Sequence, residues 1–416
     1  MKNGWQSIQL GELAELKGRI GWRGLTAKEY TKTGPLFLSV HSLNYGDYVD
    51  FRDAFHISEK RYIESPEIML QENDVLICKD GAGIGKVGIV GELPDRTTIN
   101  SSLLLIRSGK TILPKFLYRC LSSPYFQQIV NSRLNGATTP HLYQRDITEF
   151  PVVLPPLPEQ QRIVAILDEA FDGLATATAN TEKNLHNARA LFESHLQSVF
   201  ANAWRSSELV TLSDLASDIT DGDHLPPPKS PTGVPFITIG NIVKDTRKID
   251  FADTFMVPHA YFNRLKANKK PKKGDVLYTV TGSFGIPVIV SESVKFCFQR
   301  HIGLIRPKPE TSSAWLYYLL LSPQVFKQAN DGATGAAQKT VSLKLLRSFE
   351  VPKVTLKQQQ EAVTKLDTLS AETQRLESIY QQKLAALDAL KKSLLHQAFS
   401  GQLTRDNGEL IKDNGQ

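Results

Sequence analysis

The organisation of this chain is decided by the stretch LPPLPEQQRIV, residues 154–164. It opens a run that continues to about Trp204 with no proline and only one glycine, Gly173. Proline is tolerated in the first turn of a helix but not in its interior, because it lacks the N–H that an interior hydrogen bond needs. The stretch therefore predicts the start of one long helix.

Apolar side chains recur along this helix at steps of three and four, which places them on a single seam. The seam includes Ile163, Ile166, Ala170, Leu174, Ala177, Thr181, Leu185, Ala188, Phe192 and Val199. A second run, from about residue 356 to 399, has nearly heptad spacing and ends at Ser400-Gly401. Its seam consists of Val363, Leu366, Leu369, Thr373, Leu376, Tyr380, Leu384, Leu387, Leu390, Leu394 and Ala398. Each helix should have about 45 residues and measure about 65 Å.

A helix of this length with one apolar seam needs a partner. Because the chain carries two such helices, the economical arrangement is an antiparallel coiled coil within one chain, with a globular domain at each end. An intermolecular coiled coil in a homodimer is the alternative.

The helices belong to a unit that is used twice, at an offset of about 200 residues. The matching segments are 10–14 with 212–216, 34–40 with 233–239, 73–77 with 274–278, 104–107 with 303–306, 116–118 with 315–317, 136–138 with 332–334, and 160–161 with 359–360. Their order is kept and the offset is nearly constant, so the chain is an internal duplication.

The first part of each unit is rich in strand signals, namely short apolar, β-branched runs between turn residues. Strands are predicted at 36–40, 75–78, 87–90 and 103–106, and at 236–239, 276–280, 288–290 and 302–305. One amphipathic helix is predicted in each unit, at 115–129 and 314–328. The fold class is therefore α+β: two globular β-rich domains in tandem, separated by two long helices that form an antiparallel coiled coil, with an internal pseudo-two-fold repeat.

Composition narrows the function only slightly. The net charge of +6 and pI of about 9.0 suit a nucleic-acid partner, but many basic proteins bind none. The sequence contains no run of eighteen apolar residues, so we expect no membrane span. Residues 1–6 lack the apolar core of a secretory signal. The three cysteines, Cys78, Cys120 and Cys297, are far apart, which favours a reducing, cytoplasmic location.

Catalytic and metal-binding motifs are missing from the sequence, so we expect no catalytic residues and no metal ligands. The stretch KDGAGIGKVG, residues 79–88, has the wrong spacing for a phosphate loop. Its G-x-G-x-x-G pattern is followed by a strand-like Ile89-Val90 instead of a helix, so a tight β-turn is the better interpretation. The nine histidines show no H-E-x-x-H spacing, and no G-x-S-x-G elbow is present.

Basic and hydrogen-bonding residues cluster in places that suit contact with phosphates or base edges. In the first unit the loop KGRIGWRG, residues 17–24, mixes cations, an aromatic ring and glycines. An ordinary solvated basic loop is the alternative for each cluster. The predicted DNA-binding residues are Lys17, Arg19, Trp22, Arg23, Lys79, Lys86, His141, Tyr143 and Arg145 in the first unit, and Lys269, Lys270, Arg300, His301, Gln338 and Lys339 in the second.

Taken together, these features resemble the specificity subunit of type I restriction–modification enzymes over nearly the whole chain. The resemblance rests on residues 154–164, on QAFSGQLT at 397–404 after the second helix, on residues 73–76 with 81–88, and on Gly332-Ala333-Thr334 with Gln338-Lys339. The second copy departs from the pattern at VTLKQQQ, residues 354–360, where the Pro-Pro and Glu-Gln pairs are degraded.

The resemblance implies two target-recognition domains, at 1–155 and 206–353, two spacer helices, at 156–205 and 354–401, and a C-terminal tail at 402–416. It implies a non-catalytic subunit that recognises an asymmetric bipartite site in double-stranded DNA. The implied partners are two methyltransferase (modification) subunits and the endonuclease or translocase (restriction) subunits. S-adenosylmethionine, ATP and Mg would be bound by these partners, with no cofactor in this chain.

Three alternatives remain open from the sequence. The chain could be a coiled-coil protein scaffold that reads no bases, or the specificity module of a related methyltransferase-only defence complex. It could also be an enzyme with an unrecognised hydrolytic site.

Overall fold

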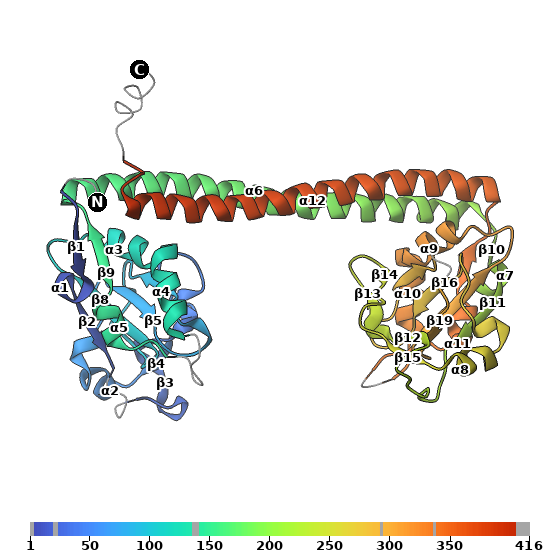
Figure 1. Cartoon of the computed structure of the whole chain (residues 1–416), viewed down its shortest axis with the longest axis horizontal. Helices are drawn as coiled ribbons and strands as arrows, with labels where there is room; N and C mark the ends of the chain where they lie inside the picture. The colour runs from blue at the N-terminus through green and yellow to red at the C-terminus, as the bar shows by residue number, and fades with distance from the viewer. Residues whose placement is uncertain (1–3, 20–23, 135–140, 292–293, 336–337, 405–416) are drawn as a thin grey trace, which may run out of the picture. The chain divides into compact units, whose positions relative to one another are not determined.

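The computed structural model describes residues 4–19, 24–134, 141–291, 294–335 and 338–404 (Figure 1). The chain divides into two compact units. Unit 1 is formed by Met1–Glu182 with Gln382–Gln416, and unit 2 by Lys183–Gln381. Each unit therefore combines a globular domain with part of both long helices.

The globular domain of unit 1 is built on a four-stranded antiparallel sheet with the order β2-β8-β5-β6. A three-stranded sheet, β4-β3-β7, lies beside it, with β3 and β7 parallel, and β1 pairs with β9. The elements are β1 (Gln6–Gln9), α1 (Leu10–Leu13), β2 (Ala14–Gly18), β3 (Tyr30–Leu38), β4 (Phe55–Ile57), α2 (Glu59–Ile63), β5 (Val75–Cys78), β6 (Val87–Ile89), β7 (Thr97–Ile99), β8 (Leu103–Ser108), α3 (Pro114–Leu121), α4 (Pro124–Leu134), α5 (Gln144–Thr148) and β9 (Pro151–Leu154).

Unit 2 repeats this topology strand for strand: β11-β19-β16-β17, β15-β12-β18 and β10-β20. It adds one hairpin, β13-β14. The elements are β10 (Leu209–Thr211), α7 (Leu212–Leu215), β11 (Ala216–Asp221), β12 (Val234–Ile237), β13 (Ile242–Val243), β14 (Lys248–Ile249), β15 (Phe255–Val257), α8 (His259–Arg264), β16 (Val276–Thr279), β17 (Pro287–Ile289), β18 (Cys297–Phe298), β19 (Ile302–Pro307), α9 (Ser313–Leu321), α10 (Pro323–Gly332), α11 (Leu343–Arg347) and β20 (Glu350–Pro352). The predicted duplication is confirmed, and each predicted strand coincides with an observed one to within a few residues.

The long helices are α6 (Leu157–Ser206), with 50 residues, and α12 (Leu356–Ser400), with 45. In unit 1, Ile163 near the start of α6 and Leu395 near the end of α12 belong to one core. In unit 2, Phe200 near the end of α6 shares a core with Leu366 near the start of α12. The start of each helix thus lies with the end of the other, as an antiparallel pair requires (Figure 1).

The predicted helical seam is correct along the middle of α6 and incomplete near its ends. Leu167 and Phe171 in unit 1, and Leu196 and Phe200 in unit 2, are buried although the seam omits them. Near each end α6 packs against a globular domain as well as against α12, so its buried stripe is wider than a coiled-coil seam. In α12, by contrast, Leu390 was placed on the seam but is 47% exposed.

The prediction of one helix at 115–129 and one at 314–328 is wrong, because each splits into two. The breaks fall just before Pro124 and Pro323, which become the first residues of α4 and α10. Proline cannot donate the hydrogen bond that would continue α3 or α9. The preceding serines, Ser123 and Ser322, instead accept hydrogen bonds from the first turn of the next helix, at Phe126 N and Val325 N (both 3.4 Å).

A buried ion pair explains part of the sequence repeat. Arg107 donates two hydrogen bonds to the Asp74 carboxylate, at 2.8 and 2.7 Å. Arg306 does the same to Asp275, at 2.9 and 2.8 Å. The two aspartates are almost fully buried, so each needs its bidentate arginine. Asp74 directly precedes β5 and Arg107 lies on the neighbouring β8, while Asp275 precedes β16 and Arg306 lies on β19. Each pair therefore helps to hold two central strands of its sheet in register.

A buried glutamine fixes each long helix to its globular domain. The Gln160 amide donates to the carbonyls of Thr111 (2.9 Å) and Pro155 (2.8 Å), and its oxygen accepts from Leu113 N (2.9 Å). Gln359 makes the equivalent three bonds, to Glu310 O, Val354 O and Ser312 N. The degraded sequence at 354–360 therefore keeps the one side chain that positions the helix. No helix in the described part of the chain is both long and apolar enough to cross a membrane.

Candidate nucleic-acid interface

Several of the predicted binding residues lie at one edge of the four-stranded sheet in each unit. In unit 1, β2 and β5 end at this edge and β8 begins there, since Gly18 pairs with Leu104 and Cys78 with Leu103. In unit 2, Asp221 pairs with Gly303 and Thr279 with Ile302 in the same arrangement. The loops that leave these strand ends share one surface in each unit. We call this surface the sheet edge.

At the sheet edge of unit 1, Lys79, Asp80 and His141 form a polar cluster. Lys79 Nζ donates to Asp80 Oδ2 at 2.8 Å, and His141 Nδ1 contacts the other carboxylate oxygen. Partial burial raises the pKa of Asp80, but the hydrogen bonds from Lys79 and His141 outweigh this and lower the pKa overall. The carboxylate therefore stays charged and holds both side chains in place.

Tyr143 projects from this cluster. Its ring lies edge-on to that of His141, with 4.6 Å between the ring centroids, and the residue is 60% exposed. Leu142 N donates to Lys79 O at 2.9 Å, which ties the Tyr143 segment to the end of β5. An exposed aromatic ring beside a lysine and a histidine can stack on a base or pack on a sugar while the cation meets a phosphate.

Of the other predicted cations of unit 1, Lys86 and Lys17 have partners of their own. Lys86 Nζ donates to Asn44 Oδ1 at 2.6 Å, and Lys17 lies 3.2 Å from Glu15. Arg145 is exposed on α5, next to Gln144, which donates to Leu16 O at 3.0 Å and joins α5 to β2. These exposed pairs are weak, so the cations can exchange them for phosphates.

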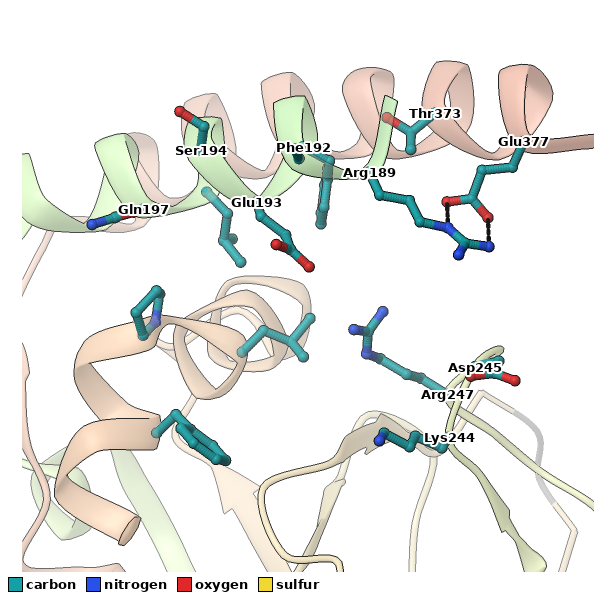
Figure 2. A pocket seen from close by; sticks show the side chains of 15 residues that line it. Arg189, Phe192, Glu193, Ser194, Gln197, Lys244, Asp245, Arg247, Thr373 and Glu377 are labelled. Carbon is teal, nitrogen blue, oxygen red and sulfur yellow. Dashed lines mark hydrogen bonds and ion pairs between the residues drawn. The ribbon is translucent and has the colours of Figure 1, made fainter. Parts of the chain in front are cut away.

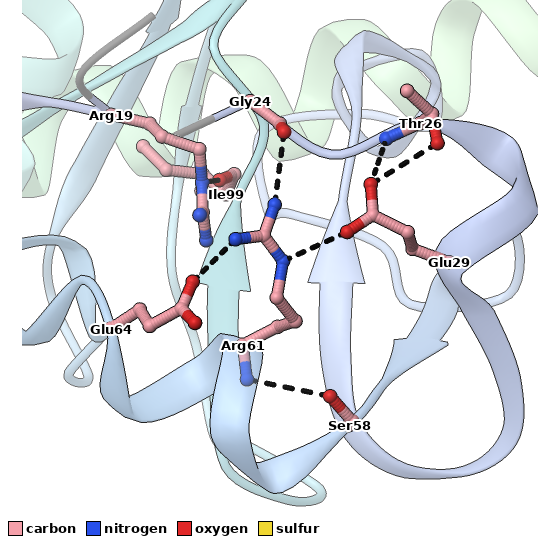
Figure 3. A network of polar contacts seen from close by, with 8 residues as sticks. All are labelled: Arg19, Gly24, Thr26, Glu29, Ser58, Arg61, Glu64 and Ile99. Atoms are coloured by element: carbon pink, nitrogen blue, oxygen red, sulfur yellow. Dashed lines mark hydrogen bonds and ion pairs between the residues drawn. The ribbon is translucent and has the colours of Figure 1, made fainter. Parts of the chain in front are cut away.

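Arg19 is placed differently from the prediction. Only 4% of it is exposed; its Nε donates to Ile99 O at 3.2 Å, and its guanidinium lies 5.5 Å from the centre of the Phe37 ring. Beside it, Arg61 donates to Gly24 O at 2.9 Å and pairs with Glu29 at 3.1 Å (Figure 3). Arg19 is therefore part of the packing of the domain. Trp22 and Arg23, which the prediction also names, lie outside the described residues.

Unit 2 has a groove of about 360 Å³ at its sheet edge. Three predicted residues, Arg300, His301 and Gln338, line it together with other polar side chains, namely Asp221, His224, Thr281 and Thr340. Burial and then the neighbouring Arg300 lower the pKa of His301, so its ring is neutral at pH 7 and can both donate and accept hydrogen bonds. A groove with donors and acceptors of this kind can meet the edges of bases.

The lysines predicted in unit 2 differ in the partners that their ammonium groups already have. Lys269 Nζ donates to Gly222 O at 2.9 Å and lies 3.7 Å from Asp221, so it stabilises the end of β11. Lys270 Nζ donates to Asn263 O at 3.0 Å. Lys339 is exposed beside the groove and donates to Asn330 at 3.1 Å. Of the three, Lys339 is the best placed for a phosphate.

Sequence reasoning missed Asp80, Thr281, Asp221 and His224. Asp80 and Thr281 occupy matched places, because Asp80 bridges to His141 and Thr281 to Thr340. The offset of 201 between residues 73 and 274 carries Asp80 onto Thr281, so the repeat contained the signal. Asp221 and His224 form a 2.7 Å hydrogen bond that no sequence spacing indicates.

Two further observations bear on chemistry within the described residues. Burial raises the pKa of the thiols of Cys120 and Cys297 to about 12, helped in Cys297 by the nearby Asp223. Both thiols are protonated at neutral pH and are poor nucleophiles. Among the side chains described, no three or more His, Cys, Asp or Glu are grouped so that they could hold a metal ion.

Comparison with known proteins gives one consistent result. A family model described as "Type I restriction modification DNA specificity domain" matches residues 2–186 and again residues 207–385. The chain is 24% identical to the type I restriction enzyme EcoBI specificity subunit of Escherichia coli over 71% of this chain and 68% of that protein. It is 21% identical to the EcoKI specificity subunit of Escherichia coli K12 over 99% of this chain and 92% of that protein.

Solved structures agree in fold. A chain from a study of complex assembly and conformational transition of the type I R-M system superposes with a TM-score of 0.78 at 20% identity, covering 96% of this chain and 99% of that one. The HsdS subunit from Thermoanaerobacter tengcongensis gives a TM-score of 0.58 at 18% identity, covering 97% and 98%. With two copies of the domain that together span most of its length, this chain belongs to the family of type I restriction modification DNA specificity domains.

Proposed function

We propose that the chain is the sequence-reading subunit of a type I restriction–modification complex, in which each globular domain reads one half of a bipartite DNA target. The observation that carries this proposal is the repeated sheet edge. The same strand ends form the edge in both units, and polar side chains suited to phosphates and bases line it twice.

The two sheet edges have different chemistry, which supports an asymmetric target. Asp80 and His141 in unit 1 are replaced by Thr281 and Thr340 at the matched positions in unit 2. Base choice depends on which donors and acceptors face the groove. Two edges with different side chains should therefore prefer different half-sites, whereas a symmetric dimer would prefer identical ones.

The antiparallel pair of α6 and α12 serves, in this proposal, as the spacer between the half-sites. Each helix is continuous from one unit into the other. A helix pair is stiff over such a length, so it would set the number of unread base pairs between the two half-sites.

Catalysis would belong to partner subunits. Two methyltransferase subunits would bind S-adenosylmethionine, and restriction subunits would bind ATP and Mg²⁺ for translocation and cleavage.

The proposal is tested by selecting bound sequences from a randomised duplex pool with the chain and its methyltransferase subunits. Tyr143→Ala should relax the preference in one half-site only, and Arg300→Ala in the other only. The expected loss at the affected base pairs is about 1–3 kcal/mol, or roughly 5- to 160-fold in discrimination.

Arg375→Ala is the matched control, because Arg375 is exposed on α12 and pairs with Glu372 in the same helix. It should leave both half-sites unchanged. Equal weakening on all sequences by Tyr143→Ala and Arg300→Ala would assign both residues to phosphates, and a pool without enrichment would contradict DNA reading.

A further inference from the structure

The polar cluster at the sheet edge of unit 1 holds one histidine ring in a single orientation. The backbones of Asp80 and His141 form an isolated β-bridge, and the imidazole contacts one carboxylate oxygen of Asp80 through Nδ1. Lys79 Nζ donates to the other oxygen at 2.8 Å. The Tyr143 ring lies edge-on to the imidazole, with 4.6 Å between the ring centroids. The His141 ring is thus fixed by a carboxylate at one nitrogen and by an aromatic ring beside it.

The Asp80 carboxylate decides which nitrogen of His141 carries the proton. Partial burial raises the pKa of Asp80, but the hydrogen bonds from Lys79 and His141 lower it overall, so the carboxylate is charged at neutral pH. A charged carboxylate can only accept hydrogen bonds, and Nδ1 must therefore be the donor in this contact. In a neutral imidazole the other nitrogen is then an acceptor. His141 presents a lone pair at Nε2.

This Nε2 atom is open to a ligand. The His141 side chain is 31% exposed at the sheet edge. Its one hydrogen bond within the described part of the chain is the contact at Nδ1. A rigidly held acceptor on a surface that meets DNA selects for a hydrogen-bond donor on the DNA.

The donors that bases offer in the major groove are exocyclic amino groups. Adenine presents N6 there and cytosine presents N4, whereas guanine and thymine present the keto oxygens O6 and O4. A keto oxygen opposite Nε2 would place two acceptors together with no proton between them, which costs a hydrogen bond. An acceptor with a fixed tautomer therefore distinguishes amino bases from keto bases.

We propose that Asp80 is a positioning residue for DNA recognition, which holds His141 so that Nε2 accepts a hydrogen bond from the amino group of an adenine or a cytosine in one half-site. This role rests on the proposed function and adds to it the class of base that the sheet edge of unit 1 recognises. Asp80 itself makes no contact with the base, since both its carboxylate oxygens are occupied by Lys79 and His141.

Unit 2 lacks this arrangement at the matched place. Thr281 and Thr340 form the equivalent backbone bridge, and their hydroxyl oxygens lie 3.4 Å apart. A hydroxyl rotates and can donate or accept, so the pair does not distinguish amino from keto bases. His301, at the same sheet edge, forms no hydrogen bond to a carboxylate among the described residues, so neither of its tautomers is fixed. The fixed acceptor is a feature of unit 1.

The first test reads the tautomer of His141 in the free chain. The full chain is labelled with ¹⁵N-histidine, and proton–nitrogen correlations within the rings are recorded at about pH 8.5, above the usual histidine pKa of about 6.5. The signals of His141 are identified by their loss in His141→Gln, and they should show the proton on Nδ1. In Asp80→Asn the one amide oxygen accepts from Lys79, which turns the amide N–H₂ toward the imidazole. The proton should then move to Nε2.

The second test selects bound sequences from a randomised duplex pool with the chain and its methyltransferase subunits. The unchanged chain should prefer adenine or cytosine at one position of one half-site. That position is identified by His141→Gln, which should remove the preference because a glutamine amide can donate or accept. Asp80→Asn should reverse the preference toward guanine or thymine, by about fivefold or more, and leave the other half-site unchanged.

Glu377→Gln is the matched control, because it makes the same change from carboxylate to amide at an ion pair outside the sheet edges. Glu377 accepts two hydrogen bonds from Arg189, at 3.1 and 3.4 Å, in a cleft of unit 2 (Figure 2). The control should change neither the tautomer of His141 nor either half-site.

Two results would overturn this role of Asp80: a proton on Nε2 in the unchanged chain, or a base preference that is the same in Asp80→Asn. A pool without enrichment would contradict the proposed function, and this role with it. The two failures are distinct, because the tautomer is measured without DNA and the half-site of unit 2 reports DNA reading independently of His141.

Discussion

At the scale of single residues, the two glutamines that open each helix have different environments. Gln160 and Gln359 are buried with three hydrogen bonds each, whereas Gln161 and Gln360 are exposed. Gln160→Ala should lower the local stability of the helix start by about 2 kcal/mol, because it leaves buried backbone groups without partners. Hydrogen exchange at residues 111–113 and 157–167 should then be about thirty-fold faster. Gln161→Ala should leave exchange unchanged, and equal effects of the two variants would refute the assignment.

The lowered pKa of the Asp47 carboxyl predicts how the stability of unit 1 depends on pH in acid. Burial raises its pKa, but the hydrogen bond from Tyr118 and the charge of Arg119 outweigh this, so the pKa is lowered overall. A carboxyl with a lower pKa in the folded state stabilises the fold above its unfolded value of about 3.9, and that contribution is lost as pH falls through the folded pKa. Asp47→Asn should therefore destabilise unit 1 at pH 7 and flatten the decline of its denaturation midpoint below about pH 4. An unchanged pH profile would show that Asp47 is not linked to folding.

The sequence indicated where some of the predicted DNA-binding residues lie in the fold, but not the packing around each of them. Lys79 and Arg300 lie at the sheet edges because they follow the ends of β5 and β18, whereas His141 and Gln338 reach the edges from the segments before α5 and after α10. Their contact with DNA stays a prediction. The burial of Arg19 was not predicted, because whether an arginine faces solvent or packs on a ring such as Phe37 depends on tertiary contacts that the sequence does not display.

At the scale of elements, the length of the helix pair should set the number of base pairs between the two half-sites. Inserting one heptad in phase into both helices, after residue 182 in α6 and at the matching level of α12, lengthens each by about 10.5 Å. At 3.4 Å per base pair the preferred spacer should grow by about three base pairs. The readout is the spacer in DNA sequences selected by the complex. The matched control replaces seven residues in each helix with the same heptad and keeps the length constant. If the longer helices selected the original spacer, they would not act as the ruler.

The elements themselves were largely predictable, and the exceptions have physical causes. Apolar runs bounded by turns predicted β3, β5, β6 and β8 and their counterparts β12, β16, β17 and β19. The prediction did not include the remaining strands of these sheets, such as β4 and β7, which have only three residues each. The splits before Pro124 and Pro323 were overlooked because the apolar periodicity continues across them, although proline alone indicates a break. Leu167 and Leu196 fell outside the predicted seam because they face a domain as well as a helix.

At the scale of the whole molecule, duplication has kept the topology and changed the surfaces. The buried pairs Asp74–Arg107 and Asp275–Arg306 are the same, whereas the sheet edges differ, and the β13–β14 hairpin occurs in unit 2 alone among the described residues.

The central claim is that one chain reads two different half-sites at a fixed separation. Methylome sequencing of a host that expresses this chain with its methyltransferase subunits tests it most directly. The account predicts methylation within one asymmetric motif, made of two unlike half-sites and a spacer of constant length. Methylation in a contiguous or palindromic motif, or in half-sites at variable separation, would contradict it.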